Sequence, residues 1–317
     1  MAIHAISDTP SPELQAALAA FESKFLYPLS NGEFFLVTHL PDRTGLLRTL
    51  AAEWSLFAAD RDSRILGTAD LALTTLHTPS AAPVPAIFYR EIRLLEEARR
   101  KTVAYRVIQA TEAWFRARAN SLVAIASDDT PLKPPDYTGR LGISKRRAVG
   151  SISHIRIPLS PASSFAPDPA YHASEPDGLA AFARLAAPFA HLAPTSAAPR
   201  SILAPQWLIH PDGTACARIE DRRRVIRLIT TTGSELRPAF LSCFAFSDPV
   251  AARQLIHAAC AIAAQAGATA LRFYIPAQSL DPLRAAAPAP LPASPATVYG
   301  SMEVPTDATW LFNASET

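Results

Sequence analysis

The sequence is poor in the residues that mark several common classes of protein. Its 317 residues include only three cysteines, an odd number, and none forms a Cys-x-x-Cys pair or a zinc-ligand spacing. We therefore expect free, buried thiols in a reducing compartment. The eight histidines are scattered, with none paired at ligand spacing, so we predict no metal site. The three cysteines are Cys216, Cys243 and Cys260.

Long apolar runs and an excess of charge of one sign are also lacking. The longest apolar run near a helix, residues 255–266, is interrupted by His257 and Gln265 and is too short to span a bilayer. No basic region followed by an apolar run opens the sequence, so we expect no signal peptide. Thirty basic and 28 acidic residues give a net charge of +2, which argues against a nucleic-acid partner. These absences predict a cytoplasmic protein that binds neither membranes nor nucleic acids.

Sequence motifs of several enzyme classes are missing as well. The chain contains no Gly-x-Ser-x-Gly, no His-Glu-x-x-His and no Gly-x-x-x-x-Gly-Lys-Ser/Thr. Those patterns supply the nucleophile of many hydrolases, a zinc site and a phosphate-binding loop. Hydrophobic residues, by contrast, make up 49% of the sequence, which is enough for a packed core. The length allows two domains of ordinary size.

The most informative stretch joins a predicted strand, residues 86–95, to a predicted helix, residues 101–119. Three cations, Arg99, Arg100 and Lys101, stand in a row where the strand gives way to the helix. A helix start presents free backbone N–H groups and the positive end of the helix dipole. Cations added there favour a phosphate or pyrophosphate as ligand. The alternative is a solvated basic helix start that binds nothing.

This stretch resembles the acetyl-coenzyme A loop of the Gcn5-related N-acetyltransferases, in which Arg/Gln-x-x-Gly-x-Gly/Ala follows a strand often written Glu-Ile-x-Val. Arg99, Thr102 and Ala104 fall on the loop positions, with Thr102 in place of the central glycine. The strand positions hold Glu91, Ile92 and Leu94. The resemblance implies that acetyl-CoA, or another acyl-CoA, is bound by Ile92, Leu94, Arg99, Arg100, Lys101, Thr102, Val103 and Ala104.

The order of the predicted elements agrees with this family. It implies an α+β fold with mixed, mostly antiparallel sheets flanked by helices. In that fold the strand before the cationic loop splays from the strand after the following helix, and the acyl-pantetheine arm lies between the two. The elements are a strand at 33–39, a helix at 44–54, a hairpin ending at residue 73, the strand, loop and helix described above, a strand at 121–126, the turn Tyr137-Thr-Gly-Arg-Leu-Gly142 and a final strand ending at Leu159.

The second half, residues 206–317, repeats this order: a hairpin, a long strand, a helix, a strand and a Tyr-Gly pair. We interpret it as a degenerate copy of the same fold, because its strand-to-helix junction is Asp248-Pro249, without a basic loop. A carboxylate there would repel a pyrophosphate and occupy the free N–H groups itself. Residues 160–205 are rich in Pro, Ala and Ser and are typical of a linker. We thus predict an N-terminal domain (1–159) with the cofactor loop, this linker, and a C-terminal degenerate domain.

Transfer of an acyl group from a thioester to an amine requires few protein groups. The carbonyl must be polarised, the amine deprotonated and the leaving thiolate protonated. Glu91 stands where many members of the family carry a glutamate that draws a proton from the amine; alternatively, it pairs with Arg90 or Arg93. Tyr137 lies close to the place of a tyrosine that protonates the thiolate; alternatively, it packs the turn. Candidates for a contact with the 3′-phosphate of coenzyme A are Arg140, Arg146 and Arg147.

Three functions remain open at this point. The first is an N-acyltransferase acting on a small-molecule or peptide amine. The second is a non-catalytic binding or regulatory module of the same fold, which the altered loop favours more than an intact motif would. The third is an acyl-carrier-protein-dependent N-acyl synthase, where a narrower loop suffices for a single phosphate. The three retained cations favour the first.

Overall fold

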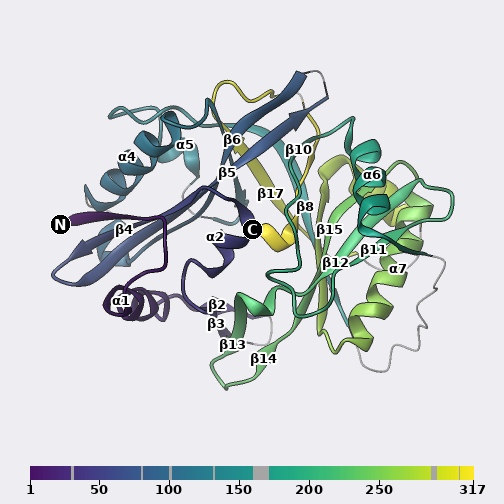
Figure 1. Ribbon diagram of the computed structural model, residues 1–317, viewed down its shortest axis with the longest axis horizontal. Coiled ribbons are helices and arrows are strands. Elements are labelled where there is room, and N and C mark those ends of the chain that lie inside the picture. The colour runs from purple at the N-terminus through teal and green to yellow at the C-terminus, as the bar shows by residue number, and fades with distance from the viewer. Residues whose placement is uncertain are drawn as a thin grey trace.

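One sheet of 14 strands runs through the whole molecule and takes strands from both halves of the sequence (Figure 1). This computed structural model describes residues 1–29, 32–79, 81–99, 102–130, 133–159, 171–286, 291–306 and 308–317. The predicted α+β class, a mostly antiparallel sheet flanked by helices, is confirmed. The strands follow one another in the order β1 (Ala2–Ile6), β4 (Trp54–Arg61), β5 (Arg64–Thr78), β6 (Ala81–Leu94), β7 (Ser121–Ser127), β17 (Ala293–Gly300), β8 (Arg147–Pro158), β16 (Ala270–Pro276), β15 (Pro238–Phe246), β12 (Ala215–Glu220), β11 (Gln206–Ile209) and β9 (His172–Ala173), with β10 (Ala190–Leu192) and β18 (Trp310–Leu311) beside this path.

A smaller sheet connects the two halves at the bottom of Figure 1. The strand predicted at residues 33–39 is present, but it belongs to this sheet and pairs there with a strand of the second half. Five consecutive residue pairs, from Ile226–His39 to Thr230–Phe35, make the contact. The four strands are β14 (Glu235–Leu236), β13 (Ile226–Thr230), β3 (Phe34–His39) and β2 (Tyr27–Pro28).

Helix α4 shows why the predicted apolar face forms a helix here. Its buried side chains recur at helical spacing, from Val103 through Val107 to Phe115, and they pack on β4 and β5. No helix within the described ranges has the length and apolar character that a membrane span requires. The helices are α1 (Pro12–Glu22), α2 (Gly45–Leu50), α3 (Glu96–Arg99), α4 (Thr102–Arg116), α5 (Pro134–Tyr137), α6 (Glu175–Ala186), α7 (Pro249–Gln265) and α8 (Leu280–Ala285), with short 3₁₀ turns at η2 (Arg222–Arg224), η3 (Ala277–Ser279) and η4 (Ala314–Glu316).

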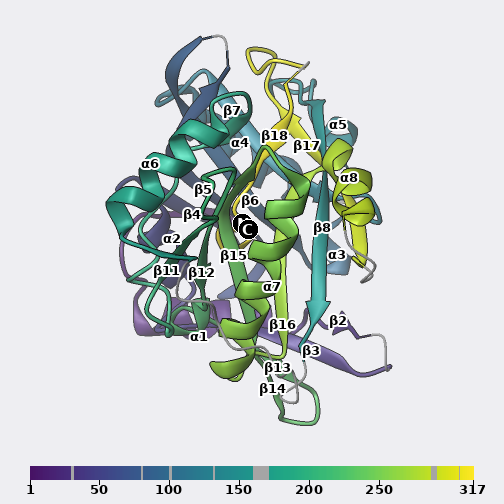
Figure 2. The same cartoon turned by 90° about the vertical axis from the view of Figure 1, so that its right-hand side faces the viewer.

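Each half contains two parallel strands bridged by a helix. In the first half β6, α4 and β7 make this unit, and in the second half β15, α7 and β16 make it. Helix α7 lies across β15 and β16 (Figure 2). At the start of α7 the carboxylate of Asp248 accepts hydrogen bonds from the backbone N–H groups of Val250 and Ala251, at 2.9 and 3.4 Å. As expected from the sequence, a side chain therefore occupies the N–H groups at this junction.

The two halves also exchange strands. Strand β17, from the end of the chain, lies between β7 and β8 and pairs with both. Strand β8, from the predicted N-terminal domain, pairs on its other edge with β16 of the second half. Within the predicted linker, residues 171–205 form β9, α6 and β10, and Phe182 and Leu185 of α6 are buried. The sheet is therefore continuous across the predicted domain boundary.

The three cysteines are free, as the sequence predicted. Cys216 and Cys243 are buried, and Cys260 is half-buried. Burial raises the pKa of each thiol to about 12. None of the three is therefore a thiolate near neutral pH.

Candidate active site

The parallel pairing between β6 and β7 stops halfway along both strands. It joins Ala86 to Ser121 and continues only as far as Tyr89 and Ala124. Beyond that point β6 continues to Leu94 and β7 to Ser127, so the two strands part with unpaired edges facing each other. A β-bulge on β6 also interrupts its ladder to β5 between Arg90 and Arg93. Bulges bend a strand and end its pairing, often beside a site.

A cavity of about 710 Å³ occupies the gap between the parted strands. This volume falls in the range of small-molecule sites. Residues of β6 and β7 form its walls, and the first two turns of α4 contribute Ala104, Tyr105 and Ile108. Much of the lining is apolar, and several arginines and two acids also contribute to it. Further lining residues are Phe25, Tyr27, Phe88, Tyr89, Arg90, Arg93, Ile125, Ala126, Pro134, Asp136, Arg140 and Thr317.

Most of the site residues predicted from the sequence meet at this cavity. Glu91, Ile92, Leu94, Arg99, Ala104 and Tyr137 all line it. The other predictions fall elsewhere. Thr102 is exposed at the first position of α4, and the side chain of Val103 is buried in the core beneath that helix. Arg100 and Lys101 lie outside the described residues.

Glu91 belongs to a buried network of charges. Its Oε2 atom lies 3.0 Å from a terminal nitrogen of Arg43 and 3.0 Å from one of Arg93. Arg43 also binds both carboxylate oxygens of Asp70, at 2.8 and 3.1 Å. Arg93 lies 3.4 Å from Glu22. The pairing with Arg93, which the sequence left open as an alternative for Glu91, is therefore present.

The network keeps Glu91 ionised. Burial alone would raise the pKa of this carboxyl, but the guanidinium groups of Arg93, Arg43 and Arg90 outweigh burial and lower its pKa well below the usual range. A carboxylate with so low a pKa is a weak proton acceptor near neutral pH. Its charge instead binds Arg43 and Arg93, of which Arg93 lines the cavity.

Tyr137 lines the cavity at the end of α5. The chain turns sharply after it, with Gly139 and Gly142 both at a φ of 78°, a conformation that glycine adopts without strain. Burial, and after it the neighbouring Tyr89, raises the pKa of Tyr137. The phenol therefore keeps its proton near neutral pH and can donate a hydrogen bond into the cavity.

The three arginines proposed for a phosphate contact have different positions. Arg140 lines the cavity, and its guanidinium carbon lies 5.1 Å from the ring centroid of Tyr105. Arg146 is buried and pairs with Glu112 at 2.7 Å. Arg147 donates hydrogen bonds to the backbone carbonyls of Met302 and Val304, at 2.9 and 3.1 Å, in the segment after β17. Only Arg140 of these three is among the cavity-lining residues described.

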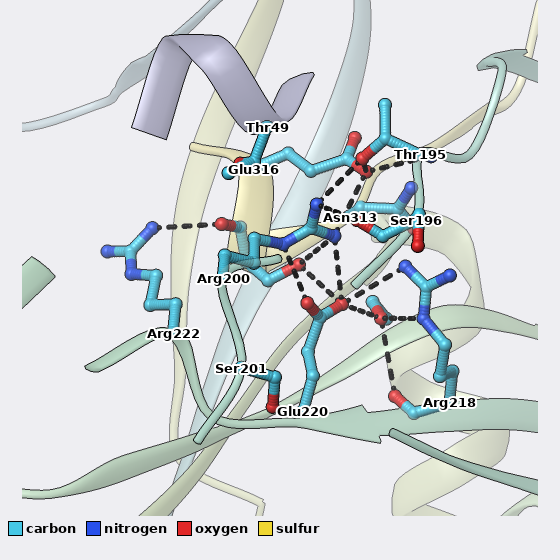
Figure 3. Close-up of polar contacts among 12 residues, drawn as sticks. Thr49, Thr195, Ser196, Arg200, Ser201, Arg218, Glu220, Arg222, Asn313 and Glu316 are labelled. Carbon is cyan, nitrogen blue, oxygen red and sulfur yellow. Dashed lines mark hydrogen bonds and ion pairs between the residues drawn. The ribbon is translucent and has the colours of Figure 1, made fainter. Parts of the chain in front are cut away.

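The last residues of the chain reach the cavity from the second half. Figure 3 shows the polar contacts that hold them. Arg200 lies between two acids, 2.7 Å from Glu220 and 3.5 Å from Glu316, and all three side chains are buried. The guanidinium of Arg222 donates to the main-chain oxygen of Thr317. Thr317, which no sequence motif pointed to, thereby becomes a lining residue.

Other residues line the cavity although the sequence analysis did not predict them, and they differ in whether a sequence pattern could have identified them. Ile108 stands four residues after Ala104 and three after Tyr105, so helical periodicity would have linked Ile108 to the predicted loop. Phe25 and Tyr27 come from the segment after α1, far from the loop in sequence. No local pattern marks those two as site residues.

Comparisons with known proteins agree with this geometry. A structure of N-myristoyltransferase from Saccharomyces cerevisiae with bound myristoyl-CoA matches with a TM-score of 0.62 and 12% identity, covering 94% of this chain and 78% of that one. A GCN5-related N-acetyltransferase from Anabaena variabilis ATCC 29413 matches with a TM-score of 0.52 and 11% identity, covering 94% and 72%. No protein-family model and no curated protein sequence matches this chain. At these identities the likeness establishes the fold, and the fold is that of the Gcn5-related N-acetyltransferases, as the strand-to-helix junction predicted.

Proposed function

We propose that this chain is an N-acyltransferase that takes its acyl group from an acyl-CoA bound between β6 and β7. The observation that carries the proposal is the cavity of about 710 Å³ that begins where the pairing of these strands stops. The facing strand edges carry backbone N–H and C=O groups free to bind a ligand. Pantetheine has two amide groups, which match such edges in the way an added strand does.

The apolar part of the lining fits the acyl end of such a ligand. Phe88, Ile92, Ile108 and Ile125 all contribute to it. Burying an acyl chain against these side chains would stabilise the complex by about 0.8 kcal/mol per CH₂ group. Acetyl-CoA and longer acyl-CoA thioesters are therefore both candidate cofactors.

The phosphate end of the cofactor would lie near the start of α4. Ala104, in the first turn of that helix, lines the cavity together with Arg99. The free N–H groups of a helix start favour an anion. In this proposal Arg99 contacts the pyrophosphate, the role that the sequence assigned to it.

The reaction would proceed without a covalent enzyme intermediate. The nitrogen of the acceptor amine attacks the thioester carbonyl, the C–S bond breaks, and the proton lost by the amine passes to solvent. Backbone N–H groups on the free edge of β6 would polarise the carbonyl. Tyr137, whose phenol keeps its proton, would donate a hydrogen bond to the departing thiolate, and the sulfur would take its proton from solvent.

The role of Glu91 is open to a direct test. We expect Glu91→Gln to lower the free energy of unfolding by about 1.5–3 kcal/mol, since a charged partner of two buried arginines is lost. We also expect turnover to fall by less than about tenfold, because an ionised carboxylate with a low pKa is a weak base. Urea unfolding and release of free CoA thiol from acyl-CoA measure the two effects.

A matched control for that change is Glu97→Gln, which removes one partner of an exposed ion pair with Arg64. It should alter stability by less than about 1 kcal/mol. A fall in turnover of about 10²–10⁴-fold for Glu91→Gln, with stability unchanged, would instead establish Glu91 as the general base.

The loop prediction is tested by Arg99→Ala. We expect this change to weaken CoA binding by about 1.5–3 kcal/mol, the range for a hydrogen bond to a charged group. Stability should hardly change, because the Arg99 side chain is 47% exposed and its ion pair among the described residues is with the neighbouring Glu96. Arg64→Ala removes a similarly exposed arginine that also pairs with a neighbouring glutamate. Equal CoA affinity in the two variants would remove Arg99 from the site.

The non-catalytic module predicts a different result from the same protein. Such a module would bind acyl-CoA without releasing CoA thiol when amines are added. A synthase dependent on acyl carrier protein would release thiol only from acylated carrier protein. Thiol release from acyl-CoA in the presence of a panel of amines supports the transferase against both alternatives.

We further propose that the second half is a copy of the fold that binds no cofactor. Its parallel pair β15–β16 also parts, after Phe240 and Arg272. Residues of the chain's own last segment fill that gap. Element η4 contacts both strands, and the Asn313 side chain accepts a hydrogen bond from the N–H of Cys243 at 2.7 Å. Asp248 occupies the helix start.

A further inference from the structure

Arg90 is a buried cation without a full set of partners. It follows Tyr89, the last residue of β6 that pairs with β7, and it lines the cavity. Its side chain is in the interior, with the residue only 5% exposed. Two of its guanidinium nitrogens, Nε and Nη2, have no hydrogen-bond partner among the described residues. An unpaired buried charge costs several kcal/mol, so this group calls for a counter-ion.

Two more arginines extend the positive charge toward the second half. Arg222 stacks on the ring of Phe240, with 4.5 Å from its guanidinium carbon to the ring centroid. Phe240 is in register with Arg272 of β16, whose Nε is also buried without a partner in the described chain. Arg272 in turn lies opposite Arg156 of β8, and like charges in that position destabilise a sheet. We call Arg90, Arg222 and Arg272 the arginine cluster.

The three members of the cluster influence one another through their charges. Burial and the like charges of Arg90 and Arg272 lower the pKa of Arg222 to about 9. Burial and the charges of Arg272, Arg156 and Arg222 also lower the pKa of the nearby His154 to about 4. Around Arg222 and His154, burial and the neighbouring arginines thus act in the same direction, against the charged form of each side chain.

The neighbouring carboxylates are already bound elsewhere. Asp70 holds Arg43, and Glu91 holds Arg43 and Arg93. Across the described ranges, no ion pair joins a carboxylate side chain to a member of the cluster. The contacts of Arg222 go to main-chain oxygens of Ser315 and Thr317. Arg90, which lines the cavity, therefore keeps two guanidinium nitrogens without a hydrogen-bond partner among the described residues.

We propose that the arginine cluster binds an oxyanion of the acceptor, so that the substrate class is an amine that also carries a carboxylate or a phosphate. This inference rests on the proposed function, which places the acyl group near the point where β6 and β7 part. Guanidinium groups bind both oxyanions through paired hydrogen bonds. The cofactor phosphates would lie at the other end of the parted segment, near Arg99 and α4, so the cluster faces the acceptor side.

The test measures binding, so that it does not depend on turnover. Wild-type protein saturated with CoA is titrated calorimetrically with N-acetylglycine and, separately, with its neutral analogue N-acetylglycinamide. O-Phosphoethanolamine and ethanolamine form a second pair, which distinguishes a phosphate from a carboxylate. We expect one anionic probe to bind at least about tenfold more tightly than its neutral partner, a difference of about 1.4 kcal/mol.

Substitutions in the cluster then test whether its arginines cause the preference for the anionic probe. In Arg90→Met the advantage of the anionic probe should fall below about threefold, while the affinity for CoA stays unchanged. Arg272→Met, at the far end of the cluster, should also reduce the difference in affinity between the anionic and the neutral probe. It replaces Arg90→Met as the test if that variant folds poorly. Arg64→Met removes an exposed arginine that lines no part of this cavity, and it should retain the wild-type preference.

Several outcomes would overturn the inference. Equal affinity for the anionic and neutral probes in the wild type would do so, as would failure of every probe to bind. A preference that survives in both Arg90→Met and Arg272→Met would remove the cluster from the site. Loss of CoA affinity in Arg90→Met would assign the cluster to the cofactor instead. If the wild type binds no CoA, the proposed function fails, and titration of the same probe pairs without CoA still tests the cluster.

Discussion

Replacing Ala126 with tryptophan should remove most of the affinity for acyl-CoA while leaving the fold intact. Ala126 lies on the part of β7 that has separated from β6, and its small side chain lines the cavity. An indole at this position would fill the space that the pantetheine arm needs. We expect binding to weaken by roughly 100-fold, about 2.7 kcal/mol, which is within the cost of forcing extra volume into a packed site.

The control for this prediction is Val84→Trp. Val84 lies on β6 as well, but at its other end, where it is 40% exposed and lines a different hollow. This variant should bind acyl-CoA as the wild type does. Calorimetric titration measures both affinities, and circular dichroism verifies that both variants are folded. If Ala126→Trp binds acyl-CoA normally, the ligand does not lie between β6 and β7.

Replacing Arg43 with methionine should lower the free energy of unfolding by about 3–5 kcal/mol, the usual effect of removing one partner from a buried ion pair. Arg43 is 4% exposed and contacts three acids, of which Asp70 is fully buried. Without Arg43, the carboxylates of Glu22 and Glu91 keep Arg93 as a partner, whereas the fully buried Asp70 loses the arginine that binds both of its oxygens. Urea unfolding monitored by tryptophan fluorescence measures the change.

Arg64→Met is the matched control for the stability prediction. Arg64 forms an ion pair of similar length with Glu97, 2.8 Å, but its side chain is 61% exposed. We expect this variant to lose less than about 1 kcal/mol. A loss of the same size in both variants, or none in either, would show that the buried network does not stabilise the fold as described.

The junction of strand and helix was predictable because it is local. Residues 86–104 carry strand, loop and helix signals in sequence order, and the cofactor contacts that we propose lie along that segment. The positions of Ile92, Leu94, Arg99, Ala104 and Tyr137 at one cavity follow from the same local pattern and the fold that it implies. The apolar face of α4 was likewise visible as helical spacing.

Long-range pairing was not predictable in the same way. One partner of Glu91, Arg43, comes from a distant segment before α2, and Arg43 in turn binds Asp70 on β5. No local pattern decides which of several nearby arginines a carboxylate will contact. The exchange of β17 and β8 between the halves also depends on strand pairing. Alternation of apolar residues marks a strand but does not name its neighbour.

The central claim is that an acyl-CoA binds in the cavity between the parted strands β6 and β7. Isothermal titration of the wild-type protein with CoA, acetyl-CoA and myristoyl-CoA tests it most directly. The account predicts one site per chain for at least one of the two thioesters, with CoA itself competing for that site. No heat of binding with any of the three, from folded protein at concentrations well above the micromolar range, would contradict it.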